Sequence, residues 1–303
     1  MEDRTIDTPF TPTAARVPWR SYLEPTKPRV VALMVFTVIV GMLLASRAPL
    51  PWRVMLFGSL GIALVAASAA AINHLVDQRI DGLMARTRGR PLPRGVLGSA
   101  QVGAFAAILG LVGMSLLLIH TNNLCAVLTL ASLLGYAVLY SLYLKRRTPQ
   151  NIVIGGAAGA APPLLGWVAV SGQVDPGALA LFLIILVWTP PHFWALAIHR
   201  RGDYARAEIP MLPITHGVAF TARRILQYTV ALCPLALLPF LIGMSGWLYL
   251  AGALALGLRF VWFAWQLRKD ERWAMPTFRF SIVHLFSLFA LLLADHFGAG
   301  WVA

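Results

Sequence analysis

Long apolar stretches separated by shorter polar segments make up almost the whole chain. Nine such stretches occur, at roughly residues 30–46, 54–72, 101–120, 124–143, 152–171, 178–198, 225–243, 247–267 and 280–299. Each is close to the about 20 residues that a helix needs to cross a bilayer core ~30 Å thick. None alternates apolar and polar residues as the strands of a membrane β-barrel do. The pattern therefore predicts an all-α integral membrane protein with nine transmembrane helices.

The segment before the first apolar stretch differs in composition. Residues 1–29 contain no apolar core and combine four acidic residues with five basic ones. A secretory signal has an apolar core, and a transit peptide is poor in acidic residues. We therefore expect residues 1–29 to form a cytoplasmic N-terminal tail. Since no linker or change of composition follows, residues 30–303 are expected to form a single transmembrane domain.

The basic residues are unevenly distributed between the two sides of the predicted membrane. The chain holds 25 Lys and Arg against 12 Asp and Glu, a formal charge of +13. If the N-terminus is cytoplasmic, 22 of the 25 lie in the inside segments, Arg47 and Arg53 lie outside, and Arg259 lies within the eighth helix. The positive-inside rule thus predicts a cytoplasmic N-terminus and an external C-terminus. The topology accounts for the high positive charge, so nucleic acid is not expected as a partner. The expected location is a bacterial inner membrane.

Two long polar segments, residues 73–98 and 199–222, follow the second and sixth stretches on the predicted cytoplasmic side. The first begins with Asn73, Asp77 and Asp81, spaced four residues apart, which share one face if the helix continues past the membrane boundary. Two carboxylates at a helix C-terminus are disfavoured by the partial negative charge there. A divalent cation removes this conflict, and Mg²⁺ binds one or two carboxylates together with phosphate oxygens.

Arginines surround this carboxylate face. The residues after it include Arg86, Arg88 and Arg90. The second segment repeats the combination, with Asp203 close to Arg200. Because guanidinium groups bind phosphate oxygens as forks, carboxylates beside arginines predict a site for a metal-bound diphosphate. The alternative is a solvated loop whose arginines set the topology and pair with the aspartates.

Several motifs resemble a known group of membrane enzymes. The stretch NHLVDQRID (73–81) is similar to the N-D-x-x-D-x-x-x-D signature of the UbiA-type membrane prenyltransferase superfamily, with His74 in place of the first aspartate. The chain further resembles one family within it, the protohaem IX farnesyltransferases or haem O synthases, in KPRV (27–30), YLKRRTPQNIVIGGAAGAAPPLLGW (143–167) and WTPPHFWALAIHRRGDYARAEIPMLP (188–213). The resemblance covers most of residues 27–213, in the same order.

The resemblance implies a nine-helix bundle with a cavity open to the cytoplasmic side and to lipid. It implies that farnesyl diphosphate and haem B are joined to give haem O for terminal oxidases, with Mg²⁺ as the divalent cation. The implied catalytic residues are Asn73, Asp77, Asp81 and Asp203, the three aspartates being the metal ligands. The implied diphosphate-binding residues are Arg86, Arg88, Arg90, Lys145, Arg146, Arg147 and Arg200. His199 stands where many members have a carboxylate.

The apolar stretches also contain candidates for a haem or prenyl cavity. These are His192, Trp188, Trp194 and Arg259, joined by Tyr204 from the polar segment 199–222. A histidine or arginine in a membrane helix is a functional candidate, with a hydrogen-bonded packing histidine and a snorkelling arginine as the alternatives. Small residues and prolines in GGAAGAAPPLLG (155–166) either open a slot for the farnesyl chain or pack helices closely. Expected partners are membrane lipid and, in the same pathway, haem A synthase or oxidase assembly factors.

Three other classes are compatible with parts of the pattern. A transporter also has many helices with buried polar residues, but its site lies near the membrane midplane, whereas these carboxylates lie at one boundary. A haem-binding cytochrome would pair histidines on facing helices, and the seven histidines form no clear pair. A UbiA-type aromatic prenyltransferase of quinone or chlorophyll biosynthesis would share the donor site, and only the resemblance favours haem as the acceptor.

Overall fold

The protein is described by a computed structural model that covers residues 18–46, 49–83 and 87–299. Within these residues, nine helical segments are long and apolar enough to cross a membrane, as predicted. Eight of them are α2 (Pro28–Ala45), α3 (Trp52–Leu83), α4 (Ser99–His120), α7 (Asn151–Ser171), α8 (Pro176–His199), α11 (Val218–Ala236, continued by α12, Leu238–Leu241), α13 (Trp247–Lys269) and α14 (Ala274–Ala299). The remaining one joins α5 (Asn123–Leu134) to η2 (Gly135–Leu144), a stretch of π-helix.

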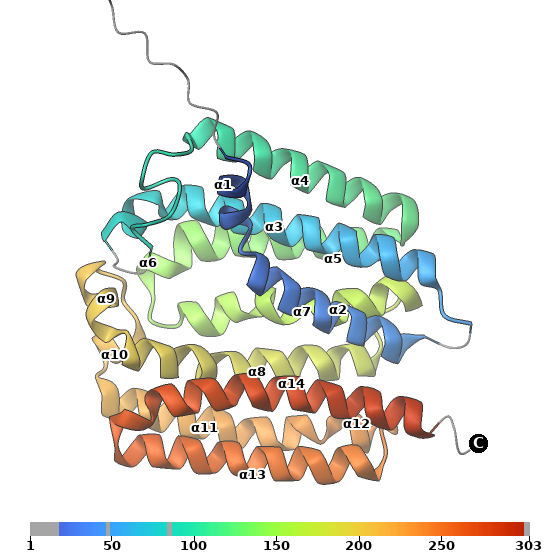
Figure 1. The fold of residues 1–303 in the computed structure, drawn as a ribbon. Helices are drawn as coiled ribbons and strands as arrows, with labels where there is room; N and C mark the ends of the chain where they lie inside the picture. The colour runs from blue at the N-terminus through green and yellow to red at the C-terminus, as the bar shows by residue number, and fades with distance from the viewer. Residues whose placement is uncertain (1–17, 47–48, 84–86, 300–303) are drawn as a thin grey trace, which may run out of the picture.

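The helices lie side by side in one bundle, with α7 and α8 at its centre (Figure 1). Helix α7 packs against α2 and α5, and α8 packs against α7, α11 and α14. The apolar windows of α7 and α8 are accordingly 56% and 61% buried, more than those of the other spans in the described chain. Helix α4 lies at the edge of the bundle, packed against α3.

Glycines bring α2 and α7 into backbone contact. A Cβ atom at Gly166 would lie 2.1 Å from the carbonyl oxygen of Val38, and one at Gly41 would lie 2.1 Å from that of Pro163. The small residues of the 155–166 stretch therefore pack helices closely, which is one of the two roles expected for them. The prolines do not open the helix, because α7 continues through Pro162 and Pro163.

The continuity of α7 has a local cause. A proline in a helix removes the hydrogen bond to the carbonyl four residues earlier. For Pro162 this is the carbonyl of Ala158, which instead accepts a hydrogen bond from Ser132 Oγ of α5 at 3.4 Å. A neighbouring helix thus satisfies the freed carbonyl, as membrane helices require. The two prolines therefore do not interrupt α7.

Two helix boundaries also differ from the apolar pattern. Helix α3 runs well past its apolar part to Leu83, and α11 begins at Val218 rather than near residue 225. Charged residues extend α3 after the end of its apolar stretch, and they extend α11 before the start of its apolar stretch. The length of an apolar stretch indicates which part of a helix lies in the hydrocarbon core, whereas the helix itself can extend into the interfacial region.

The polar connections gather at one end of the bundle. Residues 87–98 lie there together with α6 (Lys145–Arg147), α9 (Arg201–Arg206) and α10 (Leu212–Thr215), on the left in Figure 1. The C-terminal end of α14 lies at the opposite end. The short helices α1 (Arg20–Leu23) and η1 (Glu24–Thr26) precede α2, and η3 (Glu271–Trp273) joins α13 to α14. The two polar motifs of the sequence are therefore at the same end of the molecule.

Candidate active site

The first motif lies on the buried face of α3. Because the helix continues to Leu83, Asn73, Asp77 and Asp81 share one face, as their spacing predicted. Their exposed fractions are 4%, 2% and 3%. Burying a carboxylate is costly unless it is paired or binds a metal ion. The burial of both carboxylates therefore calls for positive partners.

A lysine and an arginine supply those partners. Lys145 Nζ lies 2.6 Å from Asp77 Oδ2, and Arg90 Nη1 lies 2.6 Å from Asp81 Oδ2. The side chain of Thr87 donates a hydrogen bond to the backbone carbonyl of Asp81, which holds the loop carrying Arg90 against α3. The second oxygen of Asp77, Oδ1, is buried and has no hydrogen-bond partner in the described structure.

Asn73 connects the carboxylates to two further segments. Its Oδ1 accepts a hydrogen bond from Lys27 Nζ at 2.6 Å. Its Nδ2 donates to Asp77 Oδ2 at 2.9 Å and to Ser141 Oγ at 3.0 Å. Lys27 adopts a left-handed backbone conformation (φ 51°) at the start of α2. The start of α2, the C-terminal third of α3 and the end of η2 thus meet in one polar network.

The π-helix η2 positions two side chains that contact this network, those of Tyr136 and Ser141. Tyr136 and Tyr140 stack with ring centroids 5.5 Å apart, and Ser141 is fully buried beside them. The phenol oxygen of Tyr136 accepts a hydrogen bond from Lys27 Nζ at 3.4 Å. Gly155 of α7 provides the space for Tyr140, since a Cβ there would lie 2.2 Å from its ring. Short π segments are common at functional sites because they shift side chains relative to a regular helix.

The second motif adjoins the first. Asp203 in α9 pairs with Arg206 and, at 3.5 Å, with Arg200. Ile80 of α3 and Ile209 after α9 belong to the same core cluster, so both motifs border this cluster. The polar network and the second motif therefore border one region at the polar end of the bundle.

The match to a family model fits this arrangement. The UbiA prenyltransferase family model matches residues 34–292. The chain belongs to this family. It is accordingly a membrane-embedded prenyltransferase, and the expected all-α fold is confirmed.

Relatives within the family are similar over nearly their whole length. The protoheme IX farnesyltransferase of Azotobacter vinelandii is 62% identical over 284 residues, which are 93% of this chain and 95% of that protein. Protoheme IX farnesyltransferase 1 of Pseudomonas putida is 61% identical over 287 residues, 94% of this chain and 97% of that protein.

Solved structures show the same fold at low sequence identity. A digeranylgeranylglyceryl phosphate synthase matches with a TM-score of 0.78 at 22% identity, over 91% of this chain and 98% of that one. A UbiA homolog from Archaeoglobus fulgidus bound to GPP and Mg²⁺ matches with a TM-score of 0.58 at 14% identity, over 90% of this chain and 99% of that one.

The described residues of this UbiA family member do not bring three metal-binding side chains together. No group of three or more His, Cys, Asp or Glu residues is close enough to hold one ion in the part of the chain that the structure covers. Asp77 and Asp81 each face a cation, and Asp203 pairs within its own motif. His199 is exposed. The aspartates as metal ligands therefore stay a prediction.

The predicted diphosphate-binding residues fall into three groups. Lys145, Arg90 and Arg200 pair with the aspartates. Arg88 and Arg147 are exposed, and the guanidinium of Arg147 lies 4.1 Å from the centre of the exposed Tyr143 ring. Arg86 and the side chain of Arg146 lie outside the described residues.

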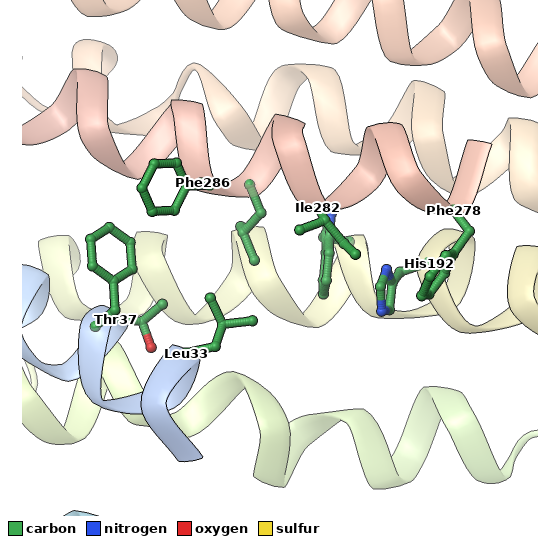
Figure 2. A pocket seen from close by; sticks show the side chains of 9 residues that line it. Leu33, Thr37, His192, Phe278, Ile282 and Phe286 are labelled. Atoms are coloured by element: carbon green, nitrogen blue, oxygen red, sulfur yellow. The ribbon is translucent and has the colours of Figure 1, made fainter. Parts of the chain in front are cut away.

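The five candidates for a haem or prenyl cavity lie in different parts of the bundle. His192 and Trp188 line a pocket between α2, α8 and α14 (Figure 2). Trp194 is buried in the core cluster behind the second motif, and Tyr204 packs against the same cluster. Arg259 is exposed on α13, with its guanidinium 5.8 Å from the centre of the Phe280 ring, so it does not line this pocket.

Three members of the polar network were not singled out from the sequence. Lys27 stands in the KPRV motif, and Tyr136 and Ser141 stand in the apolar stretch 124–143. A hydroxyl residue in a membrane helix near a predicted site is a weak signal. The π geometry that presents Ser141 to Asn73 and Tyr136 to Lys27 leaves no clear mark in the sequence.

Proposed function

We propose that the protein transfers the farnesyl group of farnesyl diphosphate to a vinyl group of haem B, giving haem O. The observation that carries the proposal is the buried network of Lys27, Asn73, Asp77 and Lys145 at one end of a membrane bundle. It combines cations for a diphosphate with a carboxylate for a divalent metal. The two relatives about 60% identical favour haem over an aromatic ring as the acceptor.

The donor set fits a divalent cation. Asp77 and Asp81 offer carboxylate oxygens on one face of α3, and Asp77 Oδ1 is buried without a hydrogen-bond partner among the described residues. We propose that Asp77, Asp81 and Asp203 hold Mg²⁺ and that Asn73 orients Asp77. When bound, Mg²⁺ supplies positive charge that neutralises the diphosphate.

The cationic residues of the chain would bind the leaving group. Lys27 donates to Asn73, and Arg90, Lys145 and Arg200 pair with the aspartates. A bound cation would compete for the aspartates and leave these side chains available to diphosphate oxygens. Such preorganised charge stabilises the negative charge that develops as the C–O bond breaks. Arg86, Arg88 and Arg146 are further candidates for this role.

The bond changes follow from the substrates. Diphosphate departs with the electron pair of the C–O bond and leaves an allylic farnesyl cation. The terminal carbon of the haem vinyl group forms a new bond with C1 of this cation, and the positive charge moves to the carbon beside the porphyrin. Water adds there and loses one proton, which leaves a hydroxyethylfarnesyl group. No ring proton has to be removed, so this acceptor requires no dedicated carboxylate base.

The test uses a bacterial host that lacks haem O. Expression of the protein should yield a pigment with the mass of haem B plus a farnesyl group and a hydroxyl group. A single turnover in ¹⁸O-labelled water should place the label in that hydroxyl. Prenylation of a quinone precursor with unchanged haem B would instead establish the aromatic acceptor.

A further inference from the structure

His192 lies in an apolar pocket formed by α2, α8 and α14. The pocket has a volume of about 130 Å³, and its lining includes Leu33 and Phe36 of α2, Trp188 and His192 of α8, and Phe278 and Phe286 of α14 (Figure 2). His192 is seven residues before the end of α8, which corresponds to about 10 Å along the helix. The proposed reaction does not yet assign this histidine a role.

The hydrogen bonds around Ser281 fix the tautomer of His192. Ser281 Oγ lies 2.6 Å from the carbonyl oxygen of Phe278 and 2.7 Å from His192 Nδ1. A hydroxyl group has one proton, and a carbonyl oxygen only accepts. The hydroxyl proton therefore goes to Phe278, and Nδ1 must carry the proton that is donated to Ser281. A neutral imidazole in this tautomer keeps its lone pair on Nε2.

The orientation of the ring is fixed as well. The imidazole stacks on Trp188, with centroids 4.3 Å apart and planes 20° apart, and Phe278 lies 4.6 Å away on another side. Trp188 Nε1 in turn donates to the backbone carbonyl of Ser281 at 2.8 Å. The described residues provide no hydrogen-bond partner for Nε2. An imidazole held through Nδ1 with a free Nε2 is the arrangement of metal-binding histidines.

The surroundings restrict which metal fits. A bare ion needs three or more protein ligands, and the pocket lining offers aromatic and aliphatic side chains, Thr37 and this single histidine. The hydroxyl of Thr37 already donates to the carbonyl of Met34. A metal that brings its own ligands in a flat apolar ring meets these conditions. We propose that His192 Nε2 is an axial ligand of the haem iron and positions the acceptor, an inference that rests on the proposed function.

The pocket must widen to admit a porphyrin. Its volume is below the roughly 300 Å³ or more of usual ligand pockets. Phe36 and Phe286 stack with centroids 5.0 Å apart and join α2 to α14. Phe286 is 53% exposed on the outer surface of the bundle. Separation of these two rings would let the porphyrin enter from the membrane side, with its rim extending toward the polar network.

Spectroscopy of haem binding tests the proposal without turnover. Purified full-length protein in detergent is titrated with ferric haem B in the absence of farnesyl diphosphate, and absorption and electron paramagnetic resonance spectra are recorded. We expect wild-type protein to show histidine-ligated iron. His192→Ala should lose this signature and bind haem at least about tenfold more weakly, and added imidazole should restore the signature in the vacated space.

Two further variants separate ligation from packing. Ser281→Ala removes the acceptor of Nδ1 and should weaken binding by about 10- to 100-fold while a histidine signature remains, which gives a second readout if His192→Ala does not fold. His284→Ala changes another buried histidine of α14, packed against Phe260 outside the pocket, and should leave the spectrum unchanged. An unaltered spectrum in folded His192→Ala would overturn the ligation, and haem O formation in the expression host would then still support the proposed function.

Discussion

Two lysines from different segments contact the polar motif of α3 (residues 73–81). Lys27, before α2, reaches Asn73, and Lys145, after η2, reaches Asp77. Breaking a buried ion pair by removing one partner is strongly destabilising, because the other charge remains buried. Each charge in the network therefore depends on its partner. A metal-bound diphosphate can replace these partners, because its metal ion would bind the aspartates and its phosphate oxygens would bind the lysines.

The carboxylates should be needed for turnover in addition to their part in the stability of the network. Asp77→Asn, Asp81→Asn and Asp203→Asn should each lower the rate of haem O formation by about a hundredfold or more, because preorganised charge of this kind has effects of that order. Activity is measured on purified protein with added Mg²⁺, and folding by size-exclusion profile and thermal denaturation.

Glu271→Gln is the matched control for this prediction. Glu271 pairs with Arg201 at 2.6 Å at the same end of the bundle, but both side chains are about half exposed. An exposed ion pair contributes little to stability, and this one is not part of the network, so activity should be unchanged. Near wild-type, Mg²⁺-dependent activity in one of the Asp→Asn variants would remove that aspartate from the metal site.

Lys27 should act on substrate binding. Lys27→Met keeps the apolar stem of the side chain but removes the charge that reaches Asn73. We expect the KM for farnesyl diphosphate to rise about tenfold or more, in line with the strength of hydrogen bonds to charged groups. Arg29→Gln, two residues away and exposed, is the control. Equal kinetics in the two variants would exclude Lys27 from the diphosphate site.

At the scale of helices, the site depends on departures from regular structure. The π-helix η2 presents Tyr136 and Ser141 to the network, and Gly155 of α7 leaves room for the ring of Tyr140. Helix α7 is in turn held against α2, whose first turn follows Lys27. The packing of α2 on α7 therefore controls the position of a site residue.

This packing can be tested at one glycine. Gly166→Ala would place a Cβ 2.1 Å from the backbone oxygen of Val38, so the helices must separate. We expect a loss of about 1–3 kcal/mol in stability, the usual cost of overpacking, seen as a lower Tm in detergent. Gly159→Ala in the same helix meets no atom within 4 Å and should keep or raise the Tm. Equal Tm values would show that the α2–α7 contact is loose.

At the scale of the whole molecule, charge and site lie at the same end of the bundle. The positive-inside rule then assigns that end to the cytoplasm, where a water-soluble diphosphate leaving group can be released. We propose this orientation together with the inner membrane as the location. The odd number of spans in the described chain puts the C-terminal end of α14 on the other side.

Reporter fusions test the orientation directly. Fusions after residues 90, 146, 205 and 270 should report the cytoplasm, and a fusion at the C-terminus should report the outside. The physical reason is the placement of 22 of the 25 Lys and Arg residues in the predicted inside segments. An external signal at 90 or 205 would contradict the shared site, because its two motifs would then face different compartments.

The sequence by itself determined the nine spans, the shared face of Asn73, Asp77 and Asp81, and the grouping of the basic loops. These properties depend on segment length, helical period and local charge, which are local quantities. The tertiary structure decided which cations pair with which aspartates, and it added Lys27, Tyr136 and Ser141 to the site. It also kept α7 continuous through two prolines. These outcomes depend on contacts between helices distant in the chain, where a glycine, a π turn or a neighbouring hydroxyl decides the geometry, so no local pattern contains them.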